Sequence, residues 1–239
     1  MQQNHGIGAA RYADAQPVSR REHVITRDDF RHPGDQTVSQ YLILGLIRAL
    51  SMHLNPPLTE DKLHQLASDI KVLLMDVDGV LTDGRLYLVP DREGKMVETK
   101  GFDSQDGIAL RWLNWFNIHT GVISGRESPA TTERARQVSM KWVFQGHIEK
   151  IPIFEKIVAE AKVQPEQICY IGDDLTDVVI MRRVGLSFAT ANARAEVKRS
   201  AMAVTGVPGG QGAVREVIEL IVKAQGHWEG LLEKYEVKV

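Results

Sequence analysis

The sequence contains almost no cysteine. Cys169 is the only one in 239 residues, and a single thiol cannot form a disulfide within the chain. It lies in the apolar run Ile168-Cys169-Tyr170-Ile171, where we expect it to pack as a small buried hydrophobic side chain. Because proteins without disulfides are typical of reducing compartments, we predict a cytoplasmic location.

An excess of charge of one sign is also lacking. The chain has 29 Lys and Arg against 31 Asp and Glu, a net charge of −2, which argues against nucleic acid or an anionic membrane as a partner. The most apolar long stretch, residues 41–54, contains Arg48 and His53 and is too short to span a bilayer. We therefore expect no nucleic-acid partner and no membrane span.

The first part of the chain, residues 1–67, has a different pattern from the rest. Residues 1 to 35 are polar without a clear period, which predicts a partly disordered or extended arm. Residues 37–54 have the pattern of an amphipathic helix that Asn55-Pro56-Pro57 would end. A short second helix should follow Thr59. We interpret this extension as a packing or oligomer-contact element.

From residue 68 onward, short apolar runs alternate with helical patterns. This alternation predicts an α/β fold: a doubly wound, Rossmann-like parallel sheet in one domain over residues 68–239. The expected strands are residues 72–75, 118–123, 142–144, 168–171, 186–189 and 203–205. The expected helices are residues 106–116, 128–138, 150–162, 175–183 and 193–199, with a long helix from Ala213.

One segment interrupts this alternation directly after the first expected strand. Residues 85–89 and 95–99 are two strand-like runs that flank Pro90-Asp91-Arg92-Glu93-Gly94. This spacing predicts a β-hairpin with a five-residue loop, which would form a flap on the domain.

Polar side chains follow the ends of the expected strands. Because ligands bind beyond the carboxyl ends of the strands in an open α/β sheet, we expect these side chains to share one crevice. They are Asp76 and Asp78 after the first strand, Ser124, Gly125 and Arg126 after the second, Lys150 after the third, and Asp173, Asp174 and Asp177 after the fourth.

Such a set of carboxylates indicates metal-assisted phosphoryl transfer. Clustered carboxylates repel one another unless a cation holds them, and oxygen-only ligands suit Mg²⁺. Asp76 is a candidate nucleophile that would form an aspartyl-phosphate. Asp78 is a candidate acid that protonates the leaving oxygen and then a base for water. Lys150 would neutralise the phosphoryl charge.

The motifs resemble those of the haloacid dehalogenase superfamily. Asp76-Val77-Asp78-Gly79-Val80-Leu81-Thr82, Ser124, Lys150 and Gly172-Asp173-Asp174-Leu175-Thr176-Asp177 match its four motifs in order and type. The resemblance implies that Asp76, Asp78 (through its carbonyl) and Asp173 bind Mg²⁺. It further implies that Ser124 and Gly125 hold the phosphoryl oxygens. Asp174 and Asp177 would act through water or by orienting Lys150.

Within that superfamily, the chain is similar to the capless phosphatases of 3-deoxy-D-manno-octulosonate 8-phosphate, which act in lipopolysaccharide synthesis. The similarity rests on residues 78–84, Phe102, Asp106-Gly107, residues 124–126, Gln145-Gly146 and residues 209–216. It implies that Asp106 and Gly107 belong to the substrate site, and Arg126 either contacts the substrate or lies on the surface.

Two residues depart from that family's pattern and leave the substrate open. Gln105 and Gln211 stand where arginine is frequent in the family, and arginine is the natural partner of a sugar-acid carboxylate. A phosphatase of another sugar acid, such as a nonulosonate 9-phosphate, therefore stays an alternative. A non-catalytic binding or oligomerisation module is the alternative from another class.

The same resemblance predicts the assembly. A capless site is open to water, and a hairpin is marginally stable without something to pack on. We therefore expect a cyclic homotetramer in which hairpin 85–99 reaches a neighbour's active site.

Overall fold

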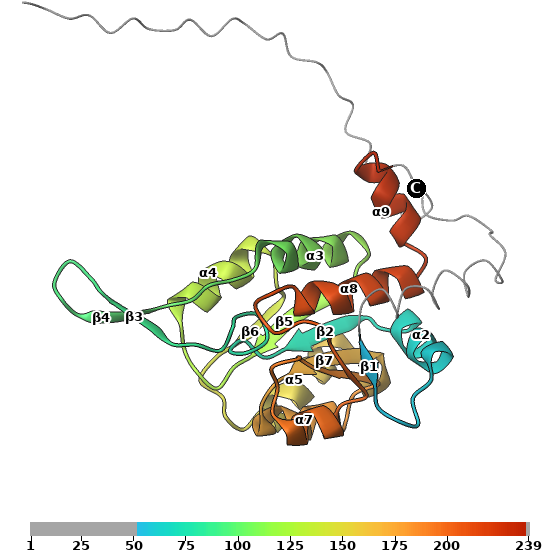
Figure 1. Cartoon of the computed structure of the whole chain (residues 1–239), viewed down its shortest axis with the longest axis horizontal. Helices are drawn as coiled ribbons and strands as arrows, with labels where there is room; N and C mark the ends of the chain where they lie inside the picture. Colours follow the sequence, from blue (N-terminus) through green and yellow to red (C-terminus); the bar gives the residue numbers. More distant parts are fainter. Residues whose placement is uncertain (1–51, 238–239) are drawn as a thin grey trace, which may run out of the picture.

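The computed structural model of the chain describes residues 52–237 (Figure 1). The arm and most of the helix expected over residues 37–54 lie outside these residues. The centre of the described part is a seven-stranded sheet with the order β1-β9-β8-β7-β2-β5-β6. Its strands are β1 His53–Leu54, β2 Val72–Met75, β5 His119–Ile123, β6 Trp142–Phe144, β7 Ile168–Gly172, β8 Leu186–Ala189 and β9 Ala203–Val204.

Six of these strands are parallel and coincide with the six expected ones. The prediction of a doubly wound parallel sheet is therefore confirmed. All four residues of β2 are fully buried, because helices cover both faces of the sheet. This double cover explains why the strand has no polar alternation in the sequence.

Helices form a layer on each side of the sheet. Figure 1 shows α3 and α8 on one face and α5 and α7 on the other. The helices are α2 Glu60–Ser68, α3 Ser104–Trp115, α4 Pro129–Gln137, α5 Ile151–Ala161, α6 Val178–Met181, α7 Ala195–Ser200, α8 Ala213–Ala224 and α9 Trp228–Lys234; short 3₁₀ turns occupy Pro165–Gln167 and Leu175–Asp177.

The long helix expected from Ala213 is confirmed as α8, and a second helix, α9, follows it. The first, α8, ends at Ala224, and Gly226 then adopts a φ of +70° before α9 begins. A left-handed residue at this position is a common helix terminator, and glycine takes it without steric cost.

Near residue 54 the structure differs from the expected helix. His53 and Leu54 form strand β1, which pairs antiparallel with β9 at the edge of the sheet. The side chain of Asn55 donates to the carbonyls of Lys198 and Ala201. Contacts with residues distant in sequence therefore determine the conformation here. The short helix expected after Thr59 is confirmed as α2, and its Leu63 is buried in the core.

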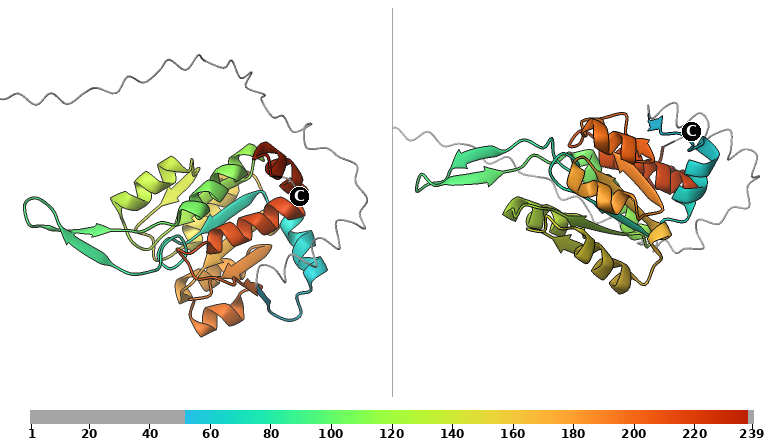
Figure 2. Two further views of the ribbon diagram at one scale, coloured as in Figure 1. Left: turned by 45° about the horizontal axis from the view of Figure 1, so that its top comes forward. Right: turned by 90° about the horizontal axis from the view of Figure 1, so that it is seen from below.

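The predicted β-hairpin is present and leaves the body of the domain. Strands β3 (Tyr87–Pro90) and β4 (Met96–Thr99) form a separate two-stranded sheet. Figures 1 and 2 show it extending away from the helices and the main sheet. At its tip, Asp91 Oδ1 accepts from the backbone N–H groups of Glu93 and Lys95, both at 2.9 Å.

Strand β2 lies between β5 and β7 at the centre of the sheet. The chain passes from β2 to one side of the sheet and later returns to β7 on the other side. This is the switch point at which the loops beyond the strands separate and leave a crevice. Among the helices of residues 52–237, none has both the length and the apolarity that a bilayer crossing requires.

Candidate active site

The loop after β2 brings Asp76 to the switch point. Gly79 in this loop has a φ of +85°, and a β-carbon there would come within 2.0 Å of Asp173 Oδ2. Thr190 and Asn192 both donate to the carbonyl of Gly79, each at 3.1 Å. Glycine is therefore required for the loop to turn closely around the carboxylate of Asp173.

The residues after β7 are arranged around the buried carboxylate of Asp177. Its Oδ2 accepts from the backbone N–H groups of Asp173 and Asp174, at 3.0 and 3.1 Å. Its Oδ1 accepts from Tyr170 Oη and Lys150 Nζ, each at 2.7 Å. Asp177 thus fixes both the loop and the lysine. Asp174 is exposed and caps the following turn, where it accepts from the N–H of Leu175.

Lys150 is the cation of the site. Its side chain is 1% exposed, and its Nζ lies 3.1 Å from Asp76 Oδ1 as well as 2.7 Å from Asp177 Oδ1. Burial would lower the pKa of Lys150, but the two carboxylates more than offset this effect, so the pKa lies above its ordinary value. The lysine is therefore charged at neutral pH.

The carboxylates around Lys150 crowd one another. Burial, together with the negative charges of Asp76 and Asp177, raises the pKa of Asp173 to about 8. Burial also raises the pKa of Asp76 to about 6, with Asp177 adding to the rise and Lys150 opposing it. Three carboxylates share a single ammonium group, so the cluster lacks positive charge.

This cluster has the chemistry of a site for a hard divalent cation. One carboxylate oxygen from each of Asp76, Asp173 and Asp177 lies within 4.8 Å of the others. Asp173 Oδ1 is buried and has no hydrogen-bond partner among the described residues. Since both oxygens of Asp177 are already occupied by donors, Asp76 and Asp173 are the carboxylates with capacity for a cation. Oxygen ligands of this kind fit Mg²⁺.

Asp78 turns its side chain away from this cluster. Its Oδ1 contacts Lys100 Nζ, and its Oδ2 lies 3.8 Å from Arg126 Nε. The carboxylate is partly exposed at the mouth of the site. Only its backbone carbonyl is therefore left for the cation role that the motif implies.

The end of β5 supplies polar groups next to Asp78. Ser124 is buried, and its Oγ accepts from the backbone N–H of Arg126 at 3.2 Å. Its carbonyl accepts from the N–H of His147, which ties this loop to the one that leads to Lys150. Arg126 projects to the surface, with a half-exposed side chain bound to Glu98.

Asp106 and Gly107 are placed elsewhere. Asp106 is 1% exposed, and its Oδ1 accepts from the backbone N–H of Arg215 at 2.7 Å, at the start of α8. Gly107 faces the guanidinium of Arg134. This buried pair connects α3 to α8 and α4, and its assignment to the substrate site stays a prediction. Gln105 and Gln211 are both exposed.

Three residues of the site were not anticipated. Tyr170 lies within an apolar strand, and its hydroxyl contact with Asp177 depends on the loop after β7. Glu98 lies in β4 and Lys100 directly follows it, and the position of the hairpin in space brings them to Asp78 and Arg126. A glutamate in a hairpin strand and a lysine directly after it give no sequence pattern from which this contact could be predicted.

A family match and two similar proteins point to the same kind of enzyme. Residues 124–218 match the family of haloacid dehalogenase-like hydrolases. The chain is 39% identical over 174 residues to 3-deoxy-D-manno-octulosonate 8-phosphate phosphatase KdsC of Yersinia pestis, which covers 73% of this chain and 90% of that protein. The corresponding protein of Escherichia coli K12 is 37% identical over 67% of this chain and 83% of its own length.

Solved structures agree with this relationship. The crystal structure of the Yersinia pestis enzyme superposes with a TM-score of 0.67 and covers 71% of this chain and 90% of that one. The enzyme from Moraxella catarrhalis, solved with magnesium, phosphate and KDO, is 33% identical. It superposes with a TM-score of 0.69 and covers 73% of this chain and 98% of its own. The chain therefore belongs to the haloacid dehalogenase-like hydrolases, within the family of the 3-deoxy-D-manno-octulosonate 8-phosphate phosphatases.

Proposed function

We propose that this protein is a magnesium-dependent phosphatase that hydrolyses a sugar-acid phosphate, with 3-deoxy-D-manno-octulosonate 8-phosphate as its substrate. One observation carries the proposal: Asp76, Asp173 and the buried Lys150 converge beyond the carboxyl ends of the central strands. This arrangement presents a nucleophile, cation ligands and a fixed positive charge to one phosphoryl group.

In the proposed reaction, a carboxylate oxygen of Asp76 attacks phosphorus while the bond between phosphorus and the sugar oxygen breaks. Asp78 gives its proton to the leaving sugar oxygen. Water then attacks the aspartyl-phosphate, Asp78 takes a proton from it, and phosphate leaves Asp76 as a free carboxylate. The position of Asp78 at the mouth, apart from the ligand cluster, suits a group that meets both the leaving sugar and water.

The other side chains stabilise the negative charge of the phosphoryl group during this transfer. Lys150 offsets the negative charge of the phosphoryl oxygens, and Asp177 with Tyr170 fixes its ammonium in place. Ser124 and Gly125 would bind phosphoryl oxygens from the opposite side. Asp76, Asp173 and the Asp78 carbonyl would hold a magnesium ion, which would supply further positive charge to the phosphoryl group.

The relatives support the choice of substrate. Proteins at 37–39% identity are 3-deoxy-D-manno-octulosonate 8-phosphate phosphatases, and one homologue was crystallised with KDO and phosphate. Since Gln105 and Gln211 are neutral, Arg126 is the candidate partner for the substrate carboxylate in this chain. This substrate places the protein in lipopolysaccharide synthesis. A cytoplasmic location suits the role, and the buried thiol of Cys169 is compatible with it.

The test measures phosphate release from a panel of phosphate esters. We expect kcat/KM for 3-deoxy-D-manno-octulosonate 8-phosphate to exceed that for glucose 6-phosphate, which lacks a carboxylate, by about 100-fold or more. Equal rates for acidic and neutral sugar phosphates would contradict the substrate assignment. No release from any ester would instead favour a non-catalytic binding module.

A nonulosonate 9-phosphate is the second candidate substrate. The observation in its favour is the absence of arginine at positions 105 and 211, since a different set of cations would suit a sugar acid of different length. A higher kcat/KM for the nine-carbon ester in the same panel would replace the first assignment with this one.

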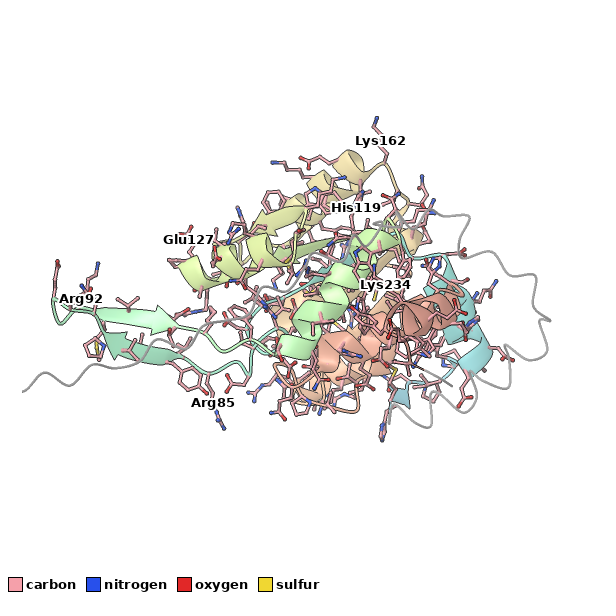
Figure 3. All side chains as sticks on the ribbon, turned by 90° about the horizontal axis from the view of Figure 1, so that it is seen from above. Arg85, Arg92, His119, Glu127, Lys162 and Lys234 are labelled. Carbon is pink, nitrogen blue, oxygen red and sulfur yellow. The ribbon has the colours of Figure 1, made fainter. Side chains whose placement is uncertain are left out.

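We further propose that the protein forms a cyclic homotetramer in which hairpin 85–99 reaches a neighbouring active site. The hairpin exposes large apolar side chains at Leu86, Leu88, Val89, Met96 and Val97. Figure 3 shows Arg92 at its tip, far from the body of the domain. A projecting apolar hairpin of this kind requires a partner surface.

Replacing residues 88–96 with a short Gly-Ser loop is expected to give a monomer and to lower kcat/KM by about tenfold or more. This change leaves Glu98 and Lys100 in place. Light scattering gives the mass, and phosphate release gives the activity. The conservative double variant Leu88→Ile/Met96→Leu serves as control and should resemble the parent. A parent that is monomeric and fully active would contradict the proposal.

A further inference from the structure

Lys100 has an unusual environment for a lysine. It directly follows strand β4, at the base of a hairpin whose strand residues are mostly exposed. Its side chain is only 2% exposed, and its Nζ contacts Asp78 Oδ1 and lies 3.0 Å from Glu98 Oε1. Lysines are rarely buried unless they are paired with acidic groups. Here one of the two acidic partners is the candidate acid and base of the reaction.

A second cation completes this arrangement. Arg126 Nη2 binds Glu98 Oε2, and Arg126 Nε lies 3.8 Å from Asp78 Oδ2. Asp78 and Glu98 are thus each approached by both cations. Glu98 comes from the hairpin and Arg126 from the loop after β5. The network therefore fixes Asp78 from two different elements.

We propose that Lys100 is a positioning residue that holds the Asp78 carboxylate on the leaving-group side of the site. This inference rests on the proposed function and adds to it a residue outside the four motifs. Asp76 and Asp173 form a cluster short of positive charge, so a cation bound there would also attract a mobile Asp78 carboxylate. The contact with Lys100 keeps Asp78 out of that cluster and directed to the mouth, where the sugar oxygen leaves.

The proposal predicts an effect that depends on the leaving group. A sugar alkoxide is a poor leaving group and needs the proton that Asp78 donates, whereas 4-nitrophenolate needs little proton donation. Without Lys100, the misplaced acid should therefore impair hydrolysis of the sugar ester far more than hydrolysis of the aryl ester. A purely structural defect would lower both activities by the same factor.

The experiment compares kcat/KM of Lys100→Met on 3-deoxy-D-manno-octulosonate 8-phosphate and on 4-nitrophenyl phosphate. Since kcat/KM reports the steps up to the first irreversible one, it isolates transfer to Asp76 from the later attack of water. We expect a loss of about 100-fold on the sugar ester and of less than about tenfold on the aryl ester. Asp78→Asn should show the same bias. Lys71→Met, at an exposed lysine before β2, is the matched control and should leave both rates unchanged.

Lys100→Arg provides the second variant, because it keeps the positive charge with a different reach. It should recover part of the rate on the sugar ester. If circular dichroism shows that Lys100→Met does not fold, kcat/KM on the two esters is compared for Lys100→Arg instead. An equal loss on both esters, or no loss on either, would overturn the inference while leaving the proposed function intact. A parent enzyme that hydrolyses neither ester would overturn the proposed function, and the role of Lys100 with it.

Discussion

Replacing Asp76 with asparagine is expected to lower kcat by about four orders of magnitude or more. The amide oxygen of asparagine is a much weaker nucleophile than a carboxylate, so no aspartyl-phosphate can form at a useful rate. The position of Asp76 supports this role, since it directly follows the central strand β2 and contacts the buried ammonium of Lys150. The measurement is phosphate release from the preferred ester at saturating concentration.

The fold of the Asp76→Asn variant should remain intact. Burial already raises the pKa of Asp76 to about 6, so its charged form is costly to bury at higher pH, and a neutral amide removes that cost. The loss of the contact with Lys150 acts in the opposite direction. We therefore expect a melting temperature within a few degrees of the parent.

Asp69→Asn is the matched control for Asp76→Asn, because Asp69 is exposed at the end of α2 and distant in the fold from the candidate site. It should retain the parent activity. Rapid acid quenching of the parent followed by mass spectrometry should detect a phosphoryl group on the peptide that contains Asp76. Residual activity of Asp76→Asn within tenfold of the parent would exclude the covalent role.

The sheet and the main site residues could be predicted from the sequence because both depend on local patterns. Val72 to Met75 form an uninterrupted apolar run followed at once by Asp76, and such a run marks a strand covered on both faces. The same reasoning applies to Asp173 after β7. Parallel strands bring their carboxyl ends together, so the sequence order of these residues was enough to predict their proximity.

The features that could not be predicted from the sequence depend on contacts between distant segments. The strand β1 exists because His53 and Leu54 pair with residues near 204, and no local pattern in residues 53–54 indicates this. The motif predicts the same role for Asp174 and Asp177, to act through water or to orient Lys150. Only the three-dimensional arrangement shows that Asp177 binds Lys150 while Asp174 caps an exposed turn.

Asp106 shows what a motif match leaves open. The Asp-Gly pair looked like a substrate site because it matched a family motif, yet Asp106 is buried against the start of α8. Burial raises its pKa to about 7, which identifies it as a carboxyl removed from water. The motif match alone does not distinguish a role in packing from a role in substrate binding.

Removal of divalent cations with a chelator is expected to lower activity to less than about 1% of the parent, and added Mg²⁺ should restore it. The physical reason lies in the charge balance, since the carboxylates of Asp76, Asp173 and Asp177 share only the ammonium of Lys150. Adding Mg²⁺ to the metal-free protein should also raise its melting temperature, because a ligand that binds only the folded state stabilises it. Full activity after exhaustive chelation would contradict a metal requirement.

Asp173→Asn separates the metal requirement from a general effect of the chelator. Asp173 Oδ1 has no hydrogen-bond partner among the described residues, so a cation would be its principal partner, and an amide oxygen binds Mg²⁺ less strongly than a carboxylate. The variant should therefore need a higher Mg²⁺ concentration for half-maximal activity, by about tenfold or more. Asp174→Asn, at the neighbouring exposed aspartate, is the matched control and should keep the parent requirement.

Ca²⁺ should occupy the same carboxylates but inhibit, because its longer bonds and looser coordination would displace the phosphoryl group from the line of attack by Asp76. A parent that is equally active with Ca²⁺ and Mg²⁺ would show that geometry at the cation does not control the reaction.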